Sequence, residues 1–133
     1  MKHLISSFRK SEAGNAVVEF ALAAPIFFMM VFGMIDVGRL YWTVSSMEYA
    51  IEAAGRYVML NISATSSQVI SQAQANLYAV NQSSVTFTTS ISNSGGVNYM
   101  AIKGQTSFNF LPSAMFNIGT LNLTRVVTVP LLP

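Results

Sequence analysis

The chain has 133 residues, of which 9% are charged, whereas about a quarter of the residues in an ordinary soluble domain carry charge. This length suits one domain plus an apolar segment, and the hydrophobic fraction of 52% favours a membrane-attached protein. The sequence has no cysteine, which excludes thiol catalysis, disulfides and cysteine-based metal sites. The net charge is only +2 and the basic residues are scattered, so the sequence indicates no binding of nucleic acid.

The acidic residues are confined to the first part of the chain, as Glu12, Glu19, Asp36, Glu48 and Glu52. The one histidine, His3, lies near the N-terminus and is expected to be solvated. The second half of the chain therefore lacks the residues for a carboxylate pair, a catalytic triad or a metal site. We expect no enzymatic activity, no metal and no cofactor.

Residues 1–14 form a short leader with three bases, Lys2, Arg9 and Lys10, and one acid, Glu12. Because positive charge is retained on the cytoplasmic side of membranes, this end is expected in the cytoplasm. The long C-terminal part is then expected to be exported.

A run without charge follows, from Phe20 to Ile35. Because a membrane-spanning helix needs about 20 residues, the helix must begin before Phe20 or continue past Asp36. Glu19 then lies inside the bilayer or at its edge, where an ionised carboxylate costs on the order of 2.5–3.5 kcal/mol. Such a cost indicates a function and a partner for Glu19.

A cleavable signal peptide is a competing interpretation of this region. The segment Ala21-Leu22-Ala23 resembles a signal-peptidase site, but the strongest apolar run follows it, whereas the apolar part of a signal peptide precedes its site. We therefore expect the helix to be retained. Pro25 lacks an N–H group, so a kink or a loosened turn is expected there.

The helical pattern continues beyond the apolar run. Apolar residues recur at steps of three and four at Val37, Tyr41, Val44, Met47, Ile51, Ala54 and Val58. Two acid-before-base pairs have helical spacing, Asp36 with Arg39 and Glu52 with Arg56. The pattern predicts one helix from about Asn15 to about Leu60. Tyr41 and Trp42 fit an aromatic belt at the membrane interface and equally well ordinary positions on a helix face.

Four small residues on the later part of this helix, Ala50, Ala53, Ala54 and Gly55, are consistent with close helix packing. Packing between subunits and packing against the chain's own sheet both explain them. The second explanation is the stronger one.

The C-terminal part predicts a short helix and a small sheet. A polar break after Leu60 contains Ser66 and Ser67, either of which can cap a helix at Gln68–Val80. The period then changes to two, with strands expected at Val85–Ile91, Val97–Lys103, Thr106–Leu111 and Leu121–Val129. Asn93–Gly96 is the expected hairpin turn. The predicted fold is α+β, with an antiparallel sheet of three or four strands.

The head of the long helix resembles a known processing site. Gly14, four residues, then Glu19 and Phe20 at the start of an apolar helix are similar to the site in type IV pilins and pseudopilins. Pro25 and three further segments point to a narrower family within this group: Val18–Leu22, Phe32–Arg39 and Ala53–Arg56. Over residues 9–60 the chain resembles the TadE-like minor pseudopilins of bacterial tight-adherence (Flp) pilus systems.

This resemblance implies that a prepilin peptidase cuts between Gly14 and Asn15. It also implies that Glu19, beside Phe20, pairs with the amino terminus of a neighbouring subunit during assembly. The expected parts are a leader at 1–14, a transmembrane and stalk helix at 15–60, and an exported α+β domain at 61–133. The expected partners are the prepilin peptidase, other pilin or pseudopilin subunits and the lipid bilayer.

The expected function is that of a minor pseudopilin in assembly of a tight-adherence pilus, because the exported part is too large for a short Flp-type major pilin. The expected location is the bacterial inner membrane, crossed once, with possible association with the pilus. One alternative is an uncleaved, membrane-anchored module that binds or adheres through its sheet. An enzyme on a membrane stalk is disfavoured by the missing catalytic residues.

Overall fold

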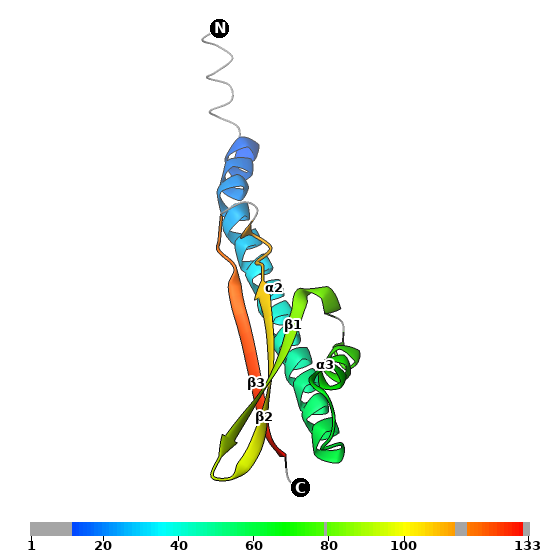
Figure 1. Ribbon diagram of the computed structural model, residues 1–133. Helices are drawn as coiled ribbons and strands as arrows, with labels where there is room; N and C mark the ends of the chain where they lie inside the picture. Colours follow the sequence, from blue (N-terminus) through cyan, green and yellow to red (C-terminus); the bar gives the residue numbers. More distant parts are fainter. Residues whose placement is uncertain (1–11, 79, 114–116, 132–133) are drawn as a thin grey trace. The chain divides into compact units, whose positions relative to one another are not determined.

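The computed structural model describes residues 12–78, 80–113 and 117–131 (Figure 1). Its elements are α2 (Glu12–Leu60), α3 (Ser66–Ala75), the short 3-10 helix η1 (Gln82–Ser84), β1 (Val85–Ser94), β2 (Val97–Phe108) and β3 (Leu121–Leu131). The α+β prediction is confirmed. The chain forms two compact units, Met1–Val37 and Gly38–Pro133, and α2 contributes to both.

Helix α2 has 49 residues, which corresponds to about 73 Å at 1.5 Å per residue. It agrees with the single helix predicted from about Asn15 to about Leu60. The α-helix continues through Pro25 without a break in its assignment. Proline removes one backbone hydrogen bond, but the helical turns before and after it remain hydrogen-bonded.

The apolar stripe on α2 is buried only in its C-terminal part. Met47, Ile51 and Val58 are almost completely buried. Tyr41 is 73% exposed, which the stripe did not predict, and the half-buried position at its level is Leu40. Neighbouring helix positions point about 100° apart, so the packed face passes through Leu40 and leaves Tyr41 outside it.

Helix α3 begins at Ser66, whereas a cap at Ser66 or Ser67 would place the first helical residue at 67 or 68. Its N-cap is Thr65, whose backbone N–H donates to the Gln68 side chain at 2.9 Å in a capping box. The helix ends at Ala75, short of the predicted Val80, and the Asn76 side chain donates to the Gln72 carbonyl at 2.8 Å. Such a local side-chain bond to the backbone competes with further helix.

The sheet has three strands in the order β1-β2-β3, and both pairings are antiparallel. The predicted hairpin is confirmed, with a two-residue turn at Gly95 (φ 59°) and Gly96 (φ 83°). Positive φ at both positions is what a type I′ turn requires, and glycine adopts it without steric cost. A separate strand at Thr106–Leu111 is wrong, because β2 runs unbroken from Val97 to Phe108 and stays paired to both neighbours.

The two faces of the sheet differ in composition. Alternate residues of β2 are buried, among them Met100 and Ile102, and they face the helices. The C-terminal part of α2 and α3 lie along this face (Figure 1). The buried core is Met47, Ala50, Ile51, Ala54, Val58, Val69, Ala73, Leu77, Val85, Phe87, Met100, Ile102 and Val129. The opposite face carries mainly hydroxyl and amide side chains, as at Thr86, Gln105 and Asn122.

Small residues set the distance between α2 and the sheet. Ala50 and Ala54 are completely buried, and a Cβ on Gly55 would lie 3.2 Å from Val129 Cγ1. On the sheet side, a Cβ on Gly104 would lie 3.1 Å from the ring of Phe87. The interpretation of the small residues as packing against the chain's own sheet is therefore confirmed.

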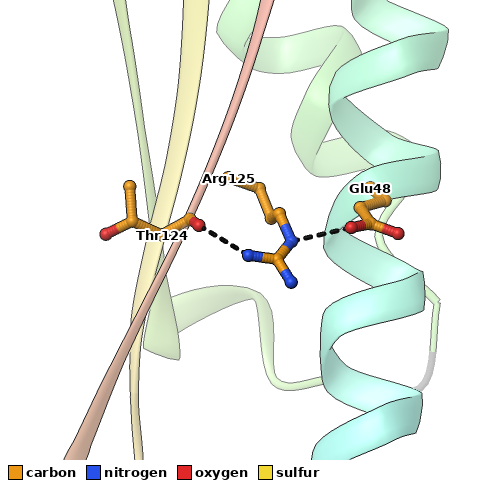
Figure 2. Close-up of polar contacts among 3 residues, drawn as sticks. All are labelled: Glu48, Thr124 and Arg125. Atoms are coloured by element: carbon orange, nitrogen blue, oxygen red, sulfur yellow. Dashed lines mark hydrogen bonds and ion pairs between the residues drawn. The ribbon is translucent and has the colours of Figure 1, made fainter.

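One ion pair joins α2 to β3. Arg125 Nε donates to Glu48 Oε1 at 2.7 Å, and Arg125 Nη1 donates to the Thr124 carbonyl at 3.1 Å (Figure 2). Arg125 lies opposite Gly104 in the sheet register, so no β2 side chain competes for the space beside it. Both charged side chains are about half exposed, at 44% and 49%, so water screens the pair.

Substitution of Gly104 by valine is expected to destabilise the C-terminal unit by about 1–3 kcal/mol, because its Cβ overpacks the core beside Phe87 and Met47. Amide hydrogen exchange of β2 in the full-length chain measures the effect. Gly119→Val is the matched control, because a Cβ there has nothing within 4 Å, and it should change stability by less than about 0.5 kcal/mol. Equal effects at the two glycines would contradict the packing argument.

A double-mutant cycle with Glu48→Gln and Arg125→Gln is expected to give a coupling energy of about 0.2–1 kcal/mol, as for partly exposed ion pairs. The coupling should shrink in 1 M salt, where the screening length is about 3 Å. The looser helix pair between Glu52 and Arg56, at 3.8 Å, is the control and should couple less. A coupling that grows with salt would rule out an electrostatic origin.

Candidate functional site

The candidate site is the head of α2, where the structure places all four residues singled out from the sequence. Gly14 and Asn15 are the third and fourth residues of the helix, and Glu19 and Phe20 follow one turn later. All four side-chain positions are exposed. The site is therefore a stretch of open helix surface and not a pocket.

The backbone at Gly14 is helical in the described part of α2. Glycine costs about 1 kcal/mol relative to alanine in a helix, and asparagine is also a poor helix former. The helix is therefore intrinsically weak at the Gly14–Asn15 bond.

Helix geometry brings Asn15 and Glu19 onto one face. They are four residues apart, which is about 6 Å along the helix axis. The Cα–Cβ bond of a helical residue tilts toward the N-terminus, so the Glu19 side chain extends toward Asn15. If the chain began at Asn15, the carboxylate would lie within the first two turns, where the helix dipole favours negative charge.

Glu19 has no ion-pair partner among the residues that the structure describes. Phe20 beside it is 71% exposed. A carboxylate and a large aromatic ring thus lie together on the surface of an apolar helix. Among the described residues, none forms an ion pair with the Glu19 carboxylate, and the Phe20 ring stays largely exposed.

The part of α2 that follows is almost entirely apolar and exposed. Within the described ranges, one helix, Gly14–Leu60, is long and apolar enough to cross a membrane, and its most apolar window has a mean hydropathy of 2.1. Along it, the rings of Phe27 and Phe28 meet edge to face with centroids 5.7 Å apart, and those of Phe28 and Phe32 stack at 6.3 Å. This exposed apolar surface fits single-pass anchoring in a lipid bilayer.

Beyond the apolar run, two charged residues of the predicted pattern have distinct surroundings. Asp36 is 3% exposed, although it follows the apolar run directly. The guanidinium of Arg39 lies 5.2 Å from the ring centre of Phe108 on β2, at cation–π distance. No local sequence pattern predicts this contact, because it joins residues far apart in the chain.

In the part of the chain that the structure describes, no three His, Asp or Glu residues lie close enough to hold a metal ion. The leader at 1–11, including His3, lies outside the described residues.

Comparison with protein-family models matches residues 14–56 to the family described as TadE-like protein. The matched segment begins at Gly14 and contains Glu19, the apolar run and the small residues up to Arg56. Neither the curated proteins nor the solved structures contain a match to the chain. Residues 14–56 thus carry the pattern of the TadE-like family of the tight-adherence pilus systems, as the sequence resemblance predicted.

Proposed function

We propose that the chain is a minor pseudopilin that is cut after Gly14 by a prepilin peptidase and then takes part in assembling a tight-adherence pilus. The observation that carries this proposal is the exposed Glu19 at the head of an apolar helix, four residues after Asn15. Among the described residues it has no ion-pair partner. The TadE-like match from residue 14 onward supports it.

The proposed cut hydrolyses the peptide bond between Gly14 and Asn15. It leaves a carboxylate on the leader and a new α-amino group on Asn15, which is largely protonated at neutral pH. Glycine lacks a Cβ, so the backbone at this bond can approach the peptidase closely. Glycine and asparagine at this bond are poor helix formers, so local unwinding ahead of the apolar run costs little.

The new amino group supplies the charge that Glu19 needs. An unpaired carboxylate at membrane depth costs on the order of 2.5–3.5 kcal/mol, and an ion pair relieves that cost. We propose that Glu19 of one subunit pairs with the Asn15 amino group of a neighbour, so that the relief is available only on assembly. Before the cut this partner group does not exist, so processing would have to precede assembly.

The proposed orientation follows from the same helix. The basic leader stays in the cytoplasm, α2 crosses the inner membrane once, and the unit formed by Gly38–Pro133 is exported. Lipid would cover the exposed apolar surface until other pilin or pseudopilin subunits replace it. The exported unit has its own core from α2, α3 and the sheet, so it does not depend on the lipid for its fold.

When the chain is produced with its prepilin peptidase, the mature protein is expected to begin at Asn15. Substitution of Gly14 by leucine should block the cut, because its side chain prevents close approach of the backbone. Gly33→Leu, in the same helix with nothing within 4 Å of a Cβ, should leave cleavage unchanged. N-terminal sequencing decides: an intact Met1 supports the uncleaved anchor, and a cut after Ala23 supports a signal peptide.

Glu19→Ala is expected to be cleaved normally but to enter pili about tenfold less or worse, because each 1.4 kcal/mol lost in assembly is a factor of ten. Glu52→Gln removes an exposed carboxylate from the same helix, far from its head, and should assemble like the wild type. Quantifying the subunit in sheared pili and in membranes separates assembly from processing. Unchanged pilus content in Glu19→Ala would contradict the pairing role.

A further inference from the structure

The open face of the sheet is the one turned away from the helices, and it carries polar side chains in rows. The strand register places Thr86 opposite Gln105 in one row and Ser107 opposite Asn122 in the next. These four residues contribute to a hollow of about 410 Å³, whose lining consists of residues with hydroxyl or amide side chains apart from Leu123. Sites for small ligands have volumes of about 300–1,000 Å³, so the hollow is large enough for one.

Cross-strand hydrogen bonds hold two amide groups of the hollow in place. Gln105 Nε2 donates to Thr124 Oγ1 at 3.3 Å, and Ser107 Oγ donates to Asn122 Oδ1 at 3.0 Å. Among the described residues, these bonds leave the side-chain oxygen of Gln105 and the side-chain NH2 of Asn122 without a partner. One acceptor and one donor are therefore oriented for a ligand, which lowers the entropic cost of binding it.

Along the described strands, Lys103 is the one charged side chain on the open face. It lies between Thr88 and Val126 in the register and is half-buried. Gln105 follows it on the same face of β2, about 7 Å further along the strand. The flexible four-carbon stem of lysine lets its ammonium group reach a ligand beside Gln105.

The acidic side chains of the C-terminal unit are already paired. Glu48 forms an ion pair with Arg125, and Glu52 forms one with Arg56. The sequence after Glu52 contains no further Asp or Glu. Lys103 has no ion-pair partner among the described residues, so a negative charge that complements it must come from another molecule.

The composition of the hollow favours a saccharide over a protein segment. The centres of protein interfaces are enriched in aromatic residues and methionine, and the described residues that line the hollow include neither. A ligand hydroxyl group that leaves water needs a hydrogen-bond partner, which hydroxyl and amide side chains supply. A carboxylate on the same ligand would complement the charge of Lys103.

We infer that the open face of the sheet binds an acidic saccharide, with a carboxylate of the sugar at Lys103 and its hydroxyl groups at Gln105 and Asn122. The charged contact supplies attraction, and the oriented amides supply selection for a hydroxylated ligand. This inference goes beyond the proposed function, which concerns the head of α2 and makes no use of the open face.

The test uses the full-length chain in a non-ionic detergent that has no sugar headgroup. Isothermal titration calorimetry compares trigalacturonate with maltotriose, a neutral trisaccharide, and with a capped triglutamate peptide of the same charge. Trigalacturonate is expected to bind about tenfold more tightly than either, because maltotriose lacks the charge and the peptide lacks the hydroxyl groups.

Lys103→Gln should weaken the binding of trigalacturonate about tenfold, whereas Lys103→Arg keeps the charge and should bind nearly as well as the wild type. Asn122→Ala should weaken it about fivefold, because one hydrogen-bond donor is lost. Arg56→Gln removes the same charge from the exposed surface of α2 and is the matched control, so it should leave the affinity unchanged. Amide hydrogen exchange of β2 verifies that each variant is folded.

Three results would each overturn the inference. The first is no binding of trigalacturonate at millimolar concentration. The second is an equal loss in Arg56→Gln and Lys103→Gln, which would reduce the effect to general charge attraction. The third is equal affinity for the triglutamate peptide, which would assign the open face to an acidic protein segment. None of these results depends on a cut after Gly14, so this inference and the proposed function can fail separately.

Discussion

A single helix serves two different surroundings, and this constraint governs the rest of the structure. In its first part α2 exposes nearly every apolar side chain, so its stability in water would be poor and its natural surroundings are lipid or other apolar helices. In its later part the same helix provides five of the thirteen residues of the buried core, among them Met47, Ile51 and Val58. The helix runs through both parts as one element, and Pro25 removes a single backbone hydrogen bond from it.

The later part of α2 depends on residues that are unusually small. Ala50, Ala54 and Gly55 let the helix approach β3 closely, and Gly104 leaves space that the side chains of Phe87 and Met47 occupy. The Glu48–Arg125 pair adds a polar contact between α2 and β3 that contributes little energy, since both side chains remain half exposed (Figure 2). Steric fit between small residues therefore determines the separation of helix and sheet.

Local patterns in the sequence predicted most of the fold. The apolar run, the three-and-four spacing and the change to period two located α2, α3 and the hairpin, because each is a property of neighbouring residues. The errors arose where tertiary pairing overrode local signals. β2 continues through Gly104 and Gln105, which looked like a break, because β1 and β3 hold it on both sides. The cap at Thr65 differs from the predicted caps at Ser66 and Ser67. Its partner Gln68 lies inside the helix, whereas the predicted helix begins at Gln68.

In the candidate site too, local sequence predicts some features and only the fold shows the others. The resemblance to a known processing site identifies Gly14, Asn15, Glu19 and Phe20, and the structure places them on one exposed stretch of helix. Long-range contacts, such as Arg125 with Glu48 and Ser46 with Tyr78, leave no trace in local sequence. They join residues more than thirty positions apart, and only folding brings them together.

Arg125 has a consequence for how copies of the exported unit can meet. β3 is an outer strand of the described sheet, with backbone groups on one side that a strand from another copy could pair with. A charged side chain directed inward from such a strand, together with Pro130 near its end, disfavours added strands, because a proline has no N–H to donate. The sheet of the Gly38–Pro133 unit is thereby protected from uncontrolled addition of strands at this edge.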